Sequence, residues 1–190
     1  MKYITLLSVL LTISLSAQTD SRSLTETQVN LEEAFANAQK EAIAGKPEKA
    51  IEMFETLYKE NRTNASIAHE LAKLYSAKKD NILIDKYAKL AVDNASENSW
   101  YISFYADFLL NNNRPQEALT YFKKLTLLSP LNTQYYQNTV DCYLLLNNKQ
   151  EAINVYNEME KNTGNIEEVY LSRFELYEDI GNESLALSQI

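Results

Sequence analysis

The sequence contains few residues of the types that catalyse reactions. It has one cysteine, Cys142, and one histidine, His69, the two residue types that form a thiolate–imidazole nucleophilic pair. A Cys/His zinc site needs three or four ligands at short spacing, and the sequence lacks GxSxG, HExxH and glycine-rich phosphate-binding motifs. Whether His69 and Cys142 can meet depends on the elements that carry them.

The composition is that of a folded, helical and acidic chain. Its 190 residues suffice for one domain or one repeat array, and 45% of them are hydrophobic while 23% are charged. Only 3 glycines and 3 prolines argue for helices joined by short loops. A net charge of -8 disfavours a nucleic-acid partner, because phosphates repel an acidic surface.

The N-terminus is typical of a secretory signal peptide over residues 1–17. Lys2 supplies one positive charge, residues 4–15 form an apolar run, and small residues up to Ala17 suit cleavage. The run is shorter than the about 20 residues that span a bilayer, so we expect no stable membrane span after cleavage; an uncleaved anchor is the alternative. Residues 18–30 are polar and predict a flexible leader. Export to a bacterial periplasm is favoured.

A 34-residue period organises the rest of the chain. The segments EKAIEMF, QEALTYF and QEAINVY begin at residues 48, 116 and 150, so successive segments are two periods and then one period apart. Without any insertion, this period divides the chain into repeats at 31–64, 65–98, 99–132 and 133–166 and an incomplete repeat at 167–190. Self-similarity at this spacing indicates a stack of identical supersecondary units.

Each repeat predicts two amphipathic helices, at repeat positions 1–14 and 17–30. Position 15 between them carries residues that accept the left-handed conformation at a helix end, namely Gly45, Asn113, Asn147 and Gly181. Lys79 is the exception at this position. The pattern places His69 and Cys142 two repeats apart, so a catalytic pair is not expected, and Cys142 falls on an apolar stripe that predicts burial.

The repeats resemble the tetratricopeptide repeat (TPR) family in their period, in alanine at positions 8 and 20, in an aromatic residue at position 24 and in proline at position 32. The matching residues are Ala38, Ala72 and Ala106, then Ala50, Ala118, Ala152 and Ala186, then Phe54, Phe122 and Tyr156, and finally Pro130. The resemblance covers residues 31–190 and implies an all-α, right-handed α-solenoid of about five helix–turn–helix repeats. Asn37 and Glu41 in the first repeat, and Ile84 and Ala88 in the second, depart from the pattern. A closed helical bundle is the alternative architecture.

The same resemblance implies that positions 2, 5, 9 and 12 of each first helix line a concave groove. We select ten of these residues as partner-binding candidates: His69, Lys73, Trp100, Asp107, Leu110, Gln137, Asp141, Leu144, Glu175 and Glu178. Trp100 is either an exposed anchor or part of the packing between repeats. The acidic residues in the C-terminal half of the groove either attract a basic partner or simply solvate the helices.

We therefore expect an exported, non-catalytic scaffold or adaptor that binds a peptide or partner helix and needs no metal or cofactor. The chain stops at Ile190, midway through a predicted helix. This favours a fragment of a longer protein, and the alternative function is the extracytoplasmic sensory arm of a membrane signalling protein. Self-association through the open C-terminal repeat is a further alternative.

Overall fold

The computed structural model describes residues 28–164 and 167–188, and every regular element among them is α-helical. The chain divides into two compact units, residues 1–62 and 63–190. The predicted signal peptide at 1–17 and leader residues 18–27 lie outside the described residues. None of the described helices is both long enough and apolar enough to cross a membrane.

The first unit is a hairpin of one helix over residues 28–43 and α2 (Pro47–Glu60). Residues 28–30, predicted as leader, already belong to the first helix. The rings of Phe35 and Phe54 pack edge to face with centroids 5.2 Å apart. Glu41, which departs from the apolar pattern, pairs with Lys49 at 2.8 Å and Lys46 at 3.4 Å. A polar side chain is tolerated there because two ammonium groups meet its carboxylate, and they lower the pKa of Glu41.

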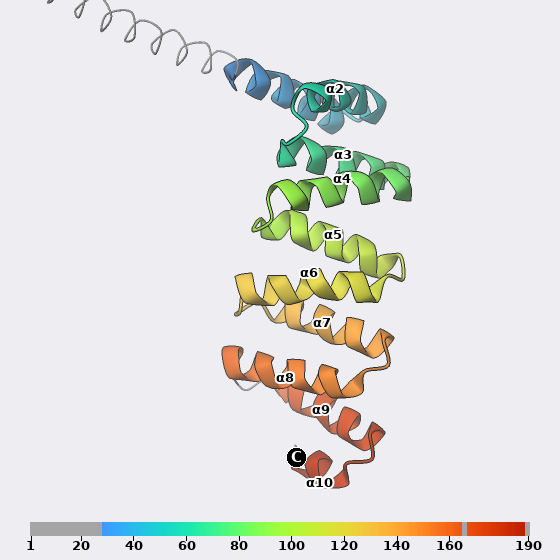
Figure 1. The fold of residues 1–190 in the computed structure, drawn as a ribbon, viewed down its shortest axis with the longest axis vertical. Helices are drawn as coiled ribbons and strands as arrows, with labels where there is room; N and C mark the ends of the chain where they lie inside the picture. Colours follow the sequence, from blue (N-terminus) through green and yellow to red (C-terminus); the bar gives the residue numbers. More distant parts are fainter. Residues whose placement is uncertain (1–27, 165–166, 189–190) are drawn as a thin grey trace, which may run out of the picture. The chain divides into compact units, whose positions relative to one another are not determined.

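The second unit contains hairpins that follow one another along the chain (Figure 1). Its described helices are α3 (Ala65–Lys78), α4 (Asn81–Asn94), α5 (Ser99–Asn111), α6 (Pro115–Leu128), α7 (Thr133–Leu145), α8 (Lys149–Thr163), α9 (Glu167–Asp179) and α10 (Glu183–Leu187). Each helix packs against the next one in sequence. The predicted all-α solenoid of helical repeats is confirmed, and α3 and α4 occupy the predicted positions 1–14 and 17–30.

Small residues recur at positions 8 and 20, at the centre of the hairpins in this unit. Ala72, Ala106, Ala118 and Ala152 are all fully buried. Their size lets the two helix backbones approach closely, and large side chains such as Phe122 fill the space beside them. Ile84 and Ala88, the departures in the second repeat, are also buried, so the core of that repeat stays apolar.

The turn at position 15 has the same backbone conformation in all five repeats. The φ angles are 74° at Gly45, 58° at Lys79, 57° at Asn113, 56° at Asn147 and 75° at Gly181. In each turn the following residue donates its backbone N–H to the carbonyl at position 11, as Asp80 does to Tyr75 at 3.1 Å. Lys79 therefore adopts the left-handed conformation predicted for position 15, although lysine is not one of the residue types that favour it. The hydrogen bond to position 11 forms only from such a turn.

Side-chain caps occur at first and second helices alike, and the two second helices that lack one, α2 and α6, begin with proline. Asn64, Asn98 and Asn132 precede first helices, and their side-chain oxygens accept backbone N–H groups of the first turn. Arg114 precedes α6 without a side-chain capping hydrogen bond, and Pro115 occupies the first helical position, where no N–H is needed and the fixed φ of proline suits the helix. The Arg114 side chain contacts the carboxylates of Asp85 and Glu117 instead.

We expect Lys79→Gly to stabilise the protein by about 1 kcal/mol, because a lysine in the left-handed region carries a steric strain that glycine lacks. The measurement is urea unfolding followed by circular dichroism. Lys78→Gly, one residue earlier, is the matched control and should destabilise by up to about 1 kcal/mol, since it places glycine in the last turn of α3. A lower midpoint for Lys79→Gly than for the wild type would contradict the strain argument.

Candidate functional site

All ten candidate residues lie in the second unit, on the first helices α3, α5, α7 and α9. We call the surface that they mark the first-helix surface. Trp100, in the first turn of α5, is 82% exposed. Of its two predicted environments, the structure therefore has the indole in solvent rather than packed between repeats. Leu144 is 39% exposed on α7, whereas Leu110 on α5 is half-buried.

His69 is half-buried between α3 and α5. Its ring lies 4.6 Å from the Tyr101 ring and 5.1 Å from the Phe104 ring, centroid to centroid. Its Nδ1 atom is buried and has no hydrogen-bond partner in the described structure. Burial, with a smaller contribution from the Lys73 ammonium, lowers the pKa of His69. His69 thus packs two repeats together, while Lys73 is exposed and pairs with Glu70 at 3.0 Å.

Acidic side chains occupy position 9 in three successive repeats. Asp107 and Glu175 are exposed and Asp141 is half-buried; Glu178, one turn beyond Glu175, is exposed as well. The neighbouring side chains displace water from Asp107 and raise its pKa. Gln137 donates to the Asp141 carboxylate at 3.0 Å and accepts from the Tyr156 hydroxyl at 3.3 Å. The C-terminal part of the first-helix surface is thus acidic.

Two hollows include candidate residues. A cavity of about 430 Å³ is lined by Asp107 together with Phe104, Phe108 and Ser76. A smaller one of about 190 Å³ is lined by Gln137 and residues of α7, α8 and α9. Both lie beside first helices, so side chains of a partner could enter between repeats as well as lie along them.

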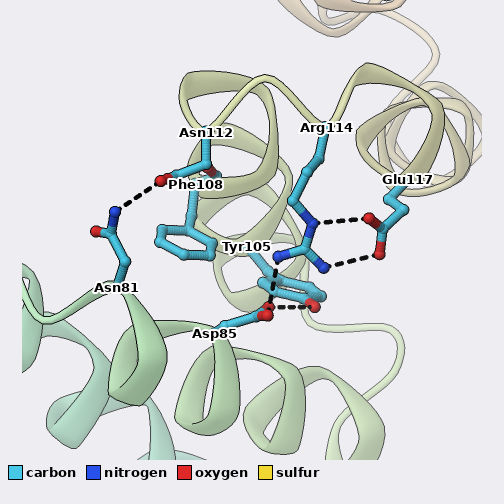
Figure 2. A network of polar contacts seen from close by, with 7 residues as sticks. All are labelled: Asn81, Asp85, Tyr105, Phe108, Asn112, Arg114 and Glu117. Carbon is cyan, nitrogen blue, oxygen red and sulfur yellow. Dashed lines mark hydrogen bonds and ion pairs between the residues drawn. The ribbon is translucent and has the colours of Figure 1, made fainter.

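A polar network whose partners could not be foreseen from the repeat pattern lies between the second and third repeats (Figure 2). Arg114 pairs with Asp85 at 2.8 Å and with both carboxylate oxygens of Glu117 at 2.7 and 2.8 Å. The Tyr105 hydroxyl donates to Asp85 at 2.8 Å. The guanidinium lowers the pKa of Glu117, while burial and then Asp85 raise the pKa of Tyr105.

One signal in the sequence could have revealed this network. Asp85 stands at position 21, where the other repeats have Ile51, Leu119, Ile153 and Leu187. A single acidic residue in an apolar column indicates that the junction is held by polar contacts, because a carboxylate facing a neighbouring helix needs a partner. The partners could not be named from the sequence, since Arg114 lies 29 residues further on.

The described residues contain no group of three or more His, Cys, Asp or Glu that could hold a metal ion. Cys142 in α7 is fully buried, as predicted, and burial raises the pKa of its thiol to about 11. Its side chain is therefore a protonated part of the core at neutral pH. The chemistry that this surface offers is non-covalent: one exposed aromatic ring, exposed leucines and a column of carboxylates.

Comparison with known proteins gives a clear result for the fold. No protein-family model matches the sequence, and no curated protein matches it. Solved structures of MamA are similar at 16% sequence identity; for one of them the match covers 84% of this chain and 87% of that chain, with a TM-score of 0.66. YrrB, described as a TPR protein with an unusual peptide-binding site, is similar at 15% identity, 82% and 80% coverage and a TM-score of 0.65. The chain has the TPR-like fold of these structures.

We expect Arg114→Gln to destabilise the protein by about 1 kcal/mol, because it leaves two partly exposed carboxylates without their cation. Urea unfolding at low and high salt is the measurement, and salt should reduce the loss. Lys123→Gln removes the same charge from an exposed position of α6 and should change stability by less than about 0.5 kcal/mol. Equal losses for the two variants would show that the network adds nothing to the junction.

We expect the His69 ring, the only imidazole of the chain, to titrate below its ordinary pKa of 6.5 in an NMR experiment. The folded state then binds the proton more weakly than the unfolded state. Stability from this group is therefore complete above pH 6.5 and decreases as the pH falls below it. His69→Phe, which keeps a ring against Tyr101 and Phe104, should remove this loss between pH 7 and about 5.5, before most carboxylates titrate. An unchanged pH profile in the variant would contradict this assignment.

Proposed function

We propose that the protein is a non-catalytic interaction scaffold that binds a peptide or a partner helix along the first-helix surface of its second unit. The observation that carries the proposal is Trp100, 82% exposed at the start of α5. A large aromatic side chain in water is unfavourable unless a partner covers it, and tryptophan is enriched among the residues that dominate binding energy. Leu144 and Leu171 add exposed apolar area on α7 and α9.

The charges of the surface favour a basic partner. Asp107, Asp141 and Glu175 recur at the same repeat position, so they form a column at the spacing of the repeats. A segment with lysine or arginine at intervals along its length would meet one carboxylate after another. Each exposed pair contributes only about 0–1 kcal/mol, so the column acts mainly on the association rate and on partner choice. The apolar side chains then supply most of the affinity.

Two further observations support this proposal. The similar YrrB structure is described as that of a peptide-binding TPR protein, which is consistent with peptide binding by this fold. The signal-like sequence at residues 1–17 supports export, so we place the scaffold outside the cytoplasm, in a periplasm or an equivalent compartment.

The test uses the full chain and a short fluorescein-labelled peptide in which lysines alternate with leucine and alanine, followed by fluorescence polarisation. We expect Asp141→Lys and Glu175→Lys each to weaken binding several-fold at low salt and less at high salt. Trp100→Ala should weaken it by about tenfold or more at both salt concentrations, because an aromatic anchor acts through apolar burial. Glu158→Lys makes the same charge change at an exposed position of α8, a second helix, and should leave binding nearly unchanged.

Two results would contradict the proposal, and the control variant reveals one of them. If Glu158→Lys weakens binding as much as Asp141→Lys, the peptide responds to net charge and not to the first-helix surface. If Trp100→Ala has no effect while the charge reversals do, the tryptophan is no anchor and the observation that carries the proposal is lost.

A further inference from the structure

The junction between the second and third repeats contains two hollows that share the residues of one hydrogen bond. The Asn81 side-chain amide donates to the Asn112 side-chain oxygen at 2.8 Å. Asn81, Phe108 and Asn112 line both hollows. One of the two hollows is the cavity lined by Asp107. The other has a volume of about 520 Å³, and we call it the junction pocket. In the view of Figure 2 the Phe108 ring lies between the asparagine pair and the Arg114–Asp85 contact.

The pocket has a cause in the sequence of the second repeat. At position 21 the other repeats have isoleucine or leucine, and Ile51, Leu119 and Ile153 are buried. Asp85 stands there instead, half-exposed, and is held by Arg114 and Tyr105. A carboxylate that turns toward a guanidinium does not fill the space that a branched apolar side chain fills. The Phe108 ring, which is only half-buried, borders that space.

An exposed apolar side chain borders the same pocket. Ile82 is 82% exposed on α4, at position 18, where the other repeats have the polar residues Glu48, Gln116, Gln150 and Ser184. Ile82, Lys86 and Lys89 are four and three residues apart, so they share one face of α4. All three line the junction pocket. The second repeat thus exposes isoleucine beside two lysines where the other repeats are polar.

The ammonium groups of Lys86 and Lys89 stand at the rim of the pocket. The Arg114 guanidinium is shared between the carboxylates of Asp85 and Glu117, so it is not available to a ligand. The Lys86 ammonium lies 4.6 Å from the centre of the Tyr87 ring. Lys89 pairs with Asp93 at 2.7 Å in an exposed contact, and such pairs contribute only about 0–1 kcal/mol, so they exchange partners readily. A carboxylate arriving at the rim therefore meets the Lys86 ammonium, and a second one if it replaces Asp93 beside Lys89.

We propose that the junction pocket binds an acidic peptide segment that carries one bulky apolar side chain. The apolar side chain lies on Ile82 and Phe108, and the flanking carboxylates face Lys86 and Lys89. The Asn81 amide stands beside the site and can pair with the peptide backbone, since its oxygen accepts and its NH2 group has a second hydrogen. The Asn112 amide already donates to the Phe108 carbonyl at 2.8 Å. The volume is within the range of ligand pockets, about 300–1,000 Å³. This site differs from the first-helix surface in position and in the charge that it selects.

The experiment measures binding of three fluorescein-labelled short peptides to the full chain by polarisation. One has leucine flanked by glutamates, one has leucine flanked by lysines, and one has serine flanked by glutamates. We expect the glutamate–leucine peptide to bind most tightly at the junction pocket. Ile82→Gln, which introduces the residue found at this position in the third and fourth repeats, should weaken its binding by about fivefold or more. Lys86→Glu combined with Lys89→Glu should weaken it by a similar factor at low salt.

Lys123→Glu is the matched control, because Lys123 is exposed and occupies in the third repeat the position that Lys89 has in the second. It should leave binding of the glutamate–leucine peptide unchanged, as should Asp141→Lys on the first-helix surface. Circular dichroism confirms that each variant folds. The proposal is overturned if the glutamate–leucine peptide does not bind, if the serine peptide binds as tightly, or if Lys123→Glu weakens binding as much as the paired change at Lys86 and Lys89.

Discussion

The left-handed residue between the two helices of each repeat is the constraint on which the rest of the structure depends. It ends the first helix at a defined residue and lets the next N–H return to the carbonyl at position 11. Because the turn is the same in every repeat, the second helix always begins two residues later, and the residues at positions 8 and 20 keep the same register from one repeat to the next. The conformation matters more than the residue type: Lys79 adopts it with φ 58° despite the strain.

The fold could be predicted closely because its determinants are local and repeated. Helix ends follow from the turn residues and from asparagine caps such as Asn64 and Asn98, each acting within a few residues of its own position. The environment of Trp100 could not be predicted, because position 2 of a first helix can face either solvent or the preceding repeat. The Arg114 network could not be predicted either, since its partners come from different helices and only Asp85 stands out in the sequence.

The burial of His69 could not be predicted from its position in the repeat either. Its repeat position placed it among groove residues, and the structure has it half-buried against Tyr101 and Phe104. The position of a side chain on a helix defines a direction, but large neighbours decide how much water remains around it. Tyr101 and Phe104 belong to the next repeat, so the burial of His69 depends on residues over thirty positions away. Trp100, also on α5, has no such cover and is exposed.

The substitution of Asp85 for an apolar residue links the stability of one junction to the chemistry of its surface. Where Leu119 and Ile153 fill neighbouring junctions, burial of apolar area holds the helices together. At Asp85, hydrogen bonds to Arg114 and Tyr105 hold the helices together instead. The pocket beside Phe108 results from the missing apolar side chain. The lysines at that pocket are exposed, and a Debye length of about 8 Å at physiological salt confines their field to the immediate surroundings. An acidic protein can therefore present two lysine ammonium groups at one pocket, since short-range contacts and not the net charge govern what such a pocket would select.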